Sequence, residues 1–162
     1  MKDFLHFAKP EEIKPESFKL DVLLKQLQLQ YKGVLDNKNI QLVVKHDWQG
    51  RVTWDLNKMK QVFINLIDNA KDAINKEGTI LININKSSSS DINIQIDDDG
   101  TGMSDTVQPN VFNLYYTTKA KGTGIGLSIV QRIIFEHKGT ITINSKKDIG
   151  TTVSITLPKI SV

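Results

Sequence analysis

Cysteine is absent from the 162 residues, and proline occurs only four times. The first absence excludes disulfides and thiolate metal sites, and it fits a reducing compartment, so we expect a cytoplasmic location. No apolar run is long enough to cross a bilayer, and the N-terminus lacks a signal-peptide core, so we expect no membrane contact. The net charge is only +3, without a long basic stripe interleaved with aromatics, so nucleic-acid binding has little support.

Residues 56–76 carry the strongest helical pattern in the chain. Apolar residues recur there at helical spacing and predict one broad buried face: Met59, Val62, Phe63, Leu66, Ile67, Ala70, Ala73 and Ile74. Asp55 is placed to cap the start, and Gly78 follows the end. A narrow polar stripe lies beside the apolar arc: Gln61, Asn65, Asn69 and Asp72. Such a stripe suits a hydrated Mg²⁺ with its phosphates, but it equally suits ordinary solvated side chains.

The rest of the chain alternates between short helical and strand patterns. We expect helices over 17–35 and 123–137, and strands over 40–45, 52–54, 79–85, 91–97, 140–144 and 152–157. Between residues 98 and 124 the periodicity is lost, which is uncommon in a compact domain unless the segment is functional, such as a lid. This order predicts an α+β fold, a two-layer α/β sandwich. Its mixed sheet of about five strands would be covered on one face by three helices.

Two glycine clusters frame the irregular segment. The first, residues 98–102 (DDGTG), directly follows a strand, where glycines allow close backbone approach and a carboxylate can accept a hydrogen bond from an exocyclic amine. A plain Asp-Gly turn explains this pentapeptide equally well. The second, residues 121–127 (KGTGIGL), opens a helix whose unblocked amides would attract an anion, with Lys119 and Lys121 adding positive charge. It is neither a Walker A loop nor the dinucleotide fingerprint.

Taken together, these motifs resemble the catalytic ATP-binding domain of sensor histidine kinases. That domain has the Bergerat ATP-binding fold shared with gyrase, heat-shock chaperones and MutL. Residues 65–70 (NLIDNA) resemble the family's N box, and residues 98–102 its first glycine box. Phe112 with residues 115–119 (YYTTK) resembles the F box, residues 122–127 the second glycine box, and residues 150–152 (GTT) the last. The order of the motifs over about residues 17–158 is more specific than any one of them.

The resemblance implies a role for each matched position. Asn69 would ligate Mg²⁺, with Asn65 supporting the metal and phosphate shell. Asp98 would bond the adenine amine, assisted by Thr151 through a water, and Lys119 would reach the phosphates from a mobile lid over about residues 103–121. Asn65, Asn69 and Lys119 are thus the expected catalytic residues. The full set around the nucleotide would be Asn65, Asn69, Asp72, Asp98, Gly100, Gly102, Thr118, Lys119, Lys121, Gly122, Thr123, Gly124, Ile125, Gly126, Leu127 and Thr151.

Two positions depart from the family pattern. Many relatives carry a basic residue three positions after the metal-binding Asn, where this chain has Asp72, so we assign the phosphate cation to Lys119. ATPases of this fold place a Glu one turn before that Asn to activate water. Here Asn65 stands there, and an amide is a poor general base. This difference favours transfer to a protein nucleophile over hydrolysis.

The acceptor histidine of the family lies on a helical hairpin before this domain and is followed by an acidic residue. None of the three histidines of this chain has that context. His6 falls in a segment (DFLHFAKP) that resembles the end of the hairpin's second helix, and His46 falls at a strand end. His137 falls in the last turn of a helix, where a cation is favourable. We interpret all three as structural.

We therefore expect residues 1–16 to be the end of a dimerisation helix plus a linker, although residues 1–10 equally fit a disordered tail. Residues 17–162 would be the catalytic domain, a monomer in isolation, with ATP and Mg²⁺ as cofactors. It would transfer the γ-phosphate to a histidine on a separate dimerisation domain, and the response regulator of the parent kinase would be a further partner. The family allows a membrane-anchored parent. Two alternatives stay open: an ATP-sensing or docking module without transfer, and an anti-sigma-type serine kinase of the same fold.

Overall fold

The alternating isoleucines of the central strands and the apolar faces of three helices meet in two layers. The computed structural model describes residues 11–120 and 122–161. Its elements are β1 (Glu16–Lys19), α2 (Leu20–Asn37), β2 (Ile40–His46), β3 (Arg51–Trp54), α3 (Leu56–Ala73), β4 (Gly78–Lys86), β5 (Asp91–Asp98), the 3₁₀-helix η1 (Gln108–Asn110), α4 (Gly126–Glu136), β6 (Thr140–Lys146) and β7 (Gly150–Pro158). Across these two ranges, no helix combines the length and apolarity that a membrane span requires.

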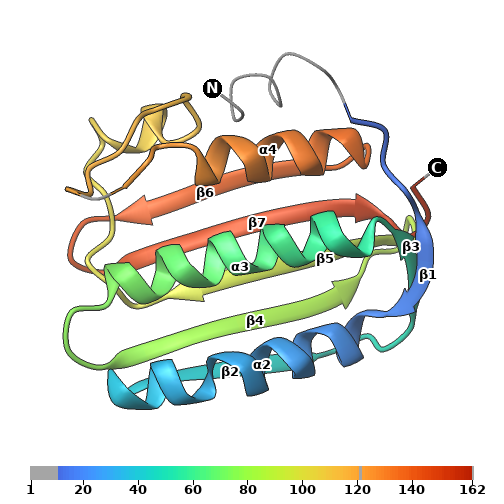
Figure 1. Cartoon of the computed structure of the whole chain (residues 1–162), viewed down its shortest axis with the longest axis horizontal. Helices are drawn as coiled ribbons and strands as arrows, with labels where there is room; N and C mark the ends of the chain where they lie inside the picture. The colour runs from blue at the N-terminus through green and yellow to red at the C-terminus, as the bar shows by residue number, and fades with distance from the viewer. Residues whose placement is uncertain (1–10, 121, 162) are drawn as a thin grey trace.

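Five strands form the main sheet in the order β2-β4-β5-β7-β6. Only β2 and β4 pair in parallel, and the other neighbours are antiparallel. Figure 1 shows α3 lying between α2 and α4 on one face of this sheet, with the small β1–β3 sheet at one side. The predicted α+β sandwich, with a mixed five-stranded sheet and three helices on one face, is confirmed for the described residues.

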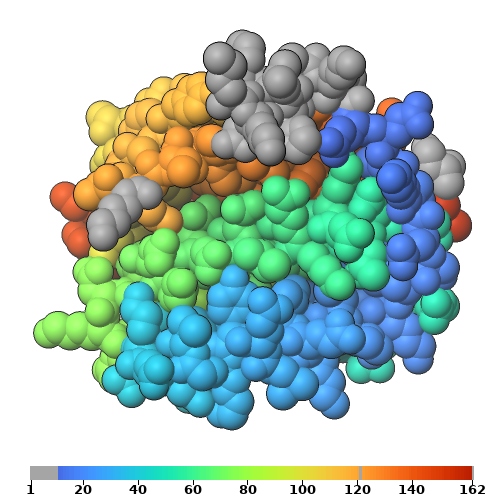
Figure 2. Space-filling view, viewed as in Figure 1, coloured from blue at the N-terminus to red at the C-terminus, as the bar shows by residue number. Residues whose placement is uncertain are grey.

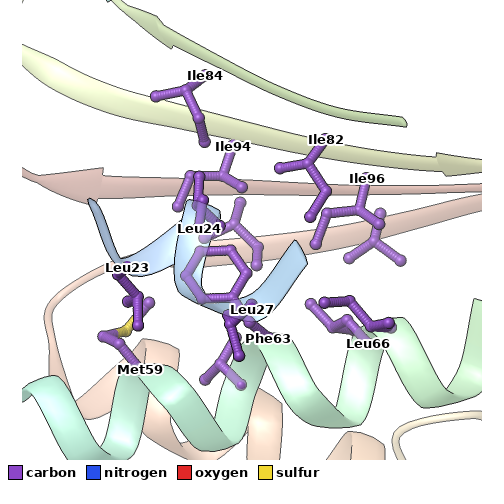
Figure 3. Close-up of a cluster of buried hydrophobic side chains, with 14 of the residues drawn as sticks. Leu23, Leu24, Leu27, Met59, Phe63, Leu66, Ile82, Ile84, Ile94 and Ile96 are labelled. Atoms are coloured by element: carbon purple, nitrogen blue, oxygen red, sulfur yellow. The ribbon is translucent and has the colours of Figure 1, made fainter. Parts of the chain in front are cut away.

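The core lies between the sheet and α3. Register brings Ile82 opposite Ile96 and Ile84 opposite Ile94, so one face of β4 and β5 is a block of isoleucine side chains. Phe63 of α3 is fully buried and points at this block, beside leucines of α2 (Figure 3). Each such side chain stabilises the fold by about 1.5–3 kcal/mol relative to an exposed one. Burying this face of α3 fixes its rotation and therefore sets where its polar stripe faces.

The N-terminus of α3 is held by a buried histidine. Asp55 caps the helix as expected, because its side chain accepts the Lys58 N–H at 3.0 Å. The Asp55 N–H itself is donated to Nε2 of His137 at 3.0 Å, and Nδ1 of His137 lies 2.8 Å from the Ile133 carbonyl. Nδ1 must therefore carry the proton, and the ring is neutral. Burial lowers the pKa of His137, so this histidine is a neutral, buried structural group although a cation would be favourable at the end of a helix.

The three largest differences between the expected and the observed element boundaries lie at helix ends. Residues 16–19 form β1 instead of the start of a helix, because Phe18 packs edge-on against Trp54 of the paired strand β3, with ring centroids 6.3 Å apart. Helix α3 ends at Ala73, since the next residue, Ile74, turns into the core. Helix α4 begins at Gly126, three residues later than expected. The expected end of a dimerisation helix falls on residues 1–10, outside the described ranges.

We predict that His137→Ala lowers the free energy of unfolding by roughly 2–4 kcal/mol, because it leaves a cavity and an unpaired Asp55 N–H. Since the folded pKa of His137 lies below the unfolded one, the wild type should also lose stability as pH falls below about 6.5. Urea unfolding between pH 5 and 8 measures both effects. His46→Ala is the matched control, and equal stability of the two variants would contradict the role of His137.

Candidate functional site

A cleft of about 530 Å³ opens beside the C-terminal half of α3. Its other walls are the ends of β5 and β7, the irregular segments 101–119 and 122–124, and the start of α4. In Figure 2 the surface of α3 lies between those of α2 and α4. The sequence-predicted residues that line the cleft are Asn65, Asn69, Asp72, Asp98, Gly102, Thr118, Lys119, Gly122, Thr123, Gly124, Gly126, Leu127 and Thr151. Gly100 and Ile125 do not line it, and Lys121 lies outside the described residues.

The polar stripe of α3 forms one wall. The Oδ1 atom of Asn65 would stand 3.1 Å from a Cβ added at Gly126, so this carboxamide faces the start of α4. One turn later, Asn69 accepts a hydrogen bond through Oδ1 from the ammonium of Lys119 at 3.0 Å. That ammonium also donates to Oδ2 of Asp72 at 2.9 Å. Three members of the stripe therefore face the cleft, whereas the fourth, Gln61, is exposed and does not line it.

The start of α4 forms the opposite wall and attracts anions. The helix begins at Gly126 with no side-chain cap, so its first N–H groups stay unpaired within the helix and carry the positive end of the dipole. The preceding Gly124 has φ of +70°, and a Cβ there would lie 2.3 Å from the backbone of Tyr115. The Tyr115 N–H donates to the Gly124 carbonyl at 2.9 Å, which closes the loop in front of the helix. Only glycine fits at this contact.

Asp98 and Thr151 stand opposite each other on β5 and β7 at the inner end of the cleft. Oδ1 of Asp98 accepts the Gly100 N–H at 2.9 Å. Burial raises the pKa of this carboxyl, against the lowering effect of the N–H groups of Gly100 and Thr151. The glycines of this cluster lie close to protein backbone: a Cβ at Gly100 would lie 2.6 Å from the Ala73 carbonyl, and one at Gly102 only 2.0 Å from that of Lys146.

Sequence reasoning missed the apolar floor of the cleft and the anchors of the lid. The floor includes Ile96, Met103, Val107, Val111, Ile143 and Val153. Val111 is buried and gives the irregular segment an apolar anchor, although the segment shows no apolar periodicity. The side chain of Gln108 pairs with the edge strand β6: it donates to the Ile143 carbonyl at 3.2 Å and accepts the Ser145 N–H at 3.1 Å. Strand alternation gave a signal for the strand residues of the floor, but the segment 103–111 shows no periodicity.

The arrangement combines an apolar slot that ends in hydrogen-bond acceptors with a rim where the ammonium of Lys119 lies beside the carboxylates of Asp68 and Asp72. A flat base fits the first part, and a polyphosphate chain fits the second, where the amides of α4 and the ammonium of Lys119 lie. The fold and the cleft thus define a nucleotide-binding α+β domain. Comparison with known proteins places the chain in the same class of domain.

The family described as histidine kinase-, DNA gyrase B-, and HSP90-like ATPase matches residues 54–161. The chain is 34% identical over 160 residues to sporulation kinase C of Bacillus subtilis. The aligned part makes up 98% of this chain and 37% of that protein. It is 32% identical over 163 residues to sensor histidine kinase ZraS of Salmonella typhi. The aligned part makes up 99% of this chain and 35% of that protein. The chain therefore spans little more than a third of the length of these relatives.

Solved structures agree. The catalytic domain of histidine kinase ThkA superposes with a TM-score of 0.82 at 27% identity, over 92% of this chain and 98% of that chain. A structure of ThkA in complex with response regulator protein TrrA gives a TM-score of 0.82 at 26% identity, over 98% of this chain and 46% of that chain. The chain belongs to the family of histidine kinase-, DNA gyrase B- and HSP90-like ATPases, as an ATP-binding catalytic domain of the sensor histidine kinase type.

We predict that Asp98→Asn weakens ATP binding at least tenfold without destabilising the domain at pH 7. The folded pKa of Asp98 is raised, so its ionised form costs stability at neutral pH, and this cost is relieved only as pH falls through that pKa. Removing the charge should leave the melting temperature unchanged or higher. Calorimetric titration and thermal unfolding measure the two effects, with Asp97→Asn as the control. An equal loss of GTP and ATP affinity would argue against an adenine contact.

Proposed function

We propose that this domain binds Mg²⁺-ATP in the cleft and transfers the γ-phosphate to a histidine on a separate dimerisation domain. The observation that supports it most is that Asn65, Asn69 and Lys119 face the uncapped start of α4 across one cleft. Phosphoryl transfer needs positioning and charge stabilisation more than covalent chemistry by the protein. These groups supply both.

The residues present fit Mg²⁺. Oδ1 of Asn69 and Oδ2 of Asp72 converge on one cation, the Lys119 ammonium, at 3.0 and 2.9 Å. Carboxamide and carboxylate oxygens are the hard ligands that Mg²⁺ prefers, and in nucleotide sites the ion takes few protein ligands and several phosphate oxygens and waters. Asn69 would hold the metal, with Asn65 beside it. When bound, the ion supplies charge stabilisation at the phosphates.

Lys119 would then act on the phosphates. Its ion pair with Asp72 joins side chains that are 43% and 42% exposed, and pairs this exposed contribute about 0–1 kcal/mol. A polyphosphate carries more negative charge than one carboxylate, so it competes well for the ammonium. The amides at the start of α4 would hold the same phosphates from the other wall and orient the terminal one. Lys119 thereby replaces the basic residue that the N box lacks at Asp72.

Transfer to a protein is better supported than hydrolysis. Asn65 is an amide and cannot serve as the base that activates water. The two histidines of the described ranges lie away from the cleft. His137 follows an 11-residue helix whose other end lines the cleft, which places it roughly 16 Å away. His46 pairs with Ile84, at the far end of β4 from the cleft. The acceptor is therefore assigned to another domain.

The linker and the partners follow from the same proposal. Residues 11–15 precede β1 and contact the start of α3, where the Lys14 N–H donates to Oδ2 of Asp55 at 2.8 Å. A domain preceding this chain segment would thus be tied to the N-terminal end of the helix that carries the cleft. We assign residues 1–16 to the dimerisation helix and linker, and residues 17–162 to the catalytic domain. The complex of ThkA with its response regulator supports a response regulator as a further partner of the parent kinase.

Asn69→Ala is expected to abolish Mg²⁺-dependent ATP binding while the domain stays folded, because Asn69 lies on the half-exposed stripe and not in the core. Isothermal titration with and without EDTA, next to a thermal melt, measures both properties. Gln61→Ala removes the one stripe residue outside the cleft and serves as the control. If the Asn69 variant bound Mg²⁺-ATP with wild-type affinity, Asn69 would not be the metal ligand.

Phosphoryl transfer itself is tested by mixing the domain with a dimerisation domain of the family and ATP labelled at the γ-phosphate. We expect an acid-labile, alkali-stable phosphohistidine that forms only with Mg²⁺, and at least a hundredfold less product with Asn69→Ala. Binding of ATP without any transfer would instead identify an ATP-sensing or docking module. Acid-stable phosphoserine on a partner would favour the serine-kinase alternative.

A further inference from the structure

Ser145 of β6 joins three parts of the site through one hydroxyl. The residue is 8% exposed. Its Oγ lies 2.8 Å from the N–H of Met103 at the root of the lid, 3.1 Å from the Gly150 carbonyl, and 2.7 Å from Oγ1 of Thr151. Thr151 lines the cleft opposite Asp98, whereas Ser145 is not among the lining residues. Ser145 therefore acts on the cleft only through the two lining residues that it contacts, Thr151 and Met103.

The protons of these groups determine the direction of each hydrogen bond. A serine hydroxyl has one proton to donate and two lone pairs to accept with. The Met103 N–H can only donate, so Ser145 accepts it. The Gly150 carbonyl can only accept, so Ser145 gives it the single proton. The remaining contact is a hydrogen bond only if Thr151 donates its own proton to Ser145. All four groups are then satisfied.

Thr151 consequently has no proton left for the cleft. Its Oγ1 offers only lone pairs there, and the ionised carboxylate of Asp98 likewise accepts only. A group bound at this end must supply the hydrogen atoms. The amino group of a 6-amino purine supplies them, whereas the carbonyl of a 6-oxo purine presents another acceptor. A bridging water would give its two protons to Asp98 and Thr151 and would then have only lone pairs to offer the base. The base must therefore donate a hydrogen bond in this case as well.

We propose that Ser145 is a positioning residue that fixes Thr151 as an acceptor and thereby sets the preference for 6-amino over 6-oxo purine nucleotides. The proposal rests on the proposed binding of ATP in this cleft. A buried acceptor left facing another acceptor costs much of its hydrogen-bond energy, so a site of this kind discriminates strongly. Removing the Ser145 hydroxyl frees the Thr151 proton, which can then be donated to a 6-oxo group.

The test is the ratio of two dissociation constants, those for Mg²⁺-ATP and Mg²⁺-ITP, measured by calorimetry on the whole chain. The wild type should prefer ATP, and Ser145→Ala should lower the ITP-to-ATP ratio of dissociation constants about tenfold. Ser145→Thr keeps the hydroxyl and should keep the wild-type ratio within about threefold. Thr142→Ala, on an exposed position of the same strand, is the matched control. The ratio separates this role from a structural one, which would change both affinities together.

An unchanged ratio in Ser145→Ala, with or without a lower melting temperature, overturns the proposal. Should that variant not fold, Ser145→Cys keeps the volume with a much weaker acceptor, and it must lower the ratio as well. An unchanged ratio in Ser145→Cys would overturn the proposal as well. In a Thr151→Val background, Ser145→Ala should have no further effect on the ratio. A wild type that binds ATP and ITP equally refutes this inference alone, whereas a wild type that binds neither refutes the proposed function.

Discussion

The structure depends on the burial of one face of α3. Its apolar side chains, Phe63 at the centre, fill the space between the sheet and the other two helices (Figure 3). Its first turn is fixed by Asp55 and the neutral ring of His137, and its last carbonyl, that of Ala73, accepts the Thr101 N–H at 2.8 Å. A helix held along one face and at both ends cannot rotate. Its carboxamides therefore stay on the wall of the cleft, with Asn65 facing the start of α4 and Asn69 facing Lys119, and phosphoryl transfer requires fixed positions of this kind.

Charge in the cleft is distributed across elements that are far apart in sequence. The acidic end of the stripe, Asp72, lies on α3, and the cation that pairs with it, Lys119, lies on the lid. The amides of α4 add a fixed positive potential that costs no side-chain entropy. In this arrangement the irregular segment carries the side-chain charge of Lys119, and the start of α4 carries the fixed backbone charge.

The sequence predicted those features whose pattern is local. The period of 3.6 residues identified α3 and its polar stripe, alternation identified β4 to β7, and glycine spacing identified the loop before α4. It missed β1, because Phe18 continues the apolar pattern of α2 and its contact with Trp54 is known only from the pairing of distant segments. It also missed the burial of Val111 and the hydrogen bond between Ser145 and Met103, which joins segments far apart in the chain. Of the predicted cleft residues, Gly100 and Ile125 act in packing and helix geometry beside the cleft.

The central claim is that the α3 stripe and the start of α4 hold the same metal-bound nucleotide. Paramagnetic Mn²⁺ in place of Mg²⁺ tests it directly in an isotope-labelled domain saturated with ADP, because Mn²⁺ broadens the amide signals of nearby residues. The account predicts that broadening centres on residues 65–72 and 122–127, while the β1–β3 sheet at the other end of the molecule keeps sharp signals. Broadening that centres elsewhere, or that spares either of those two segments, would contradict it.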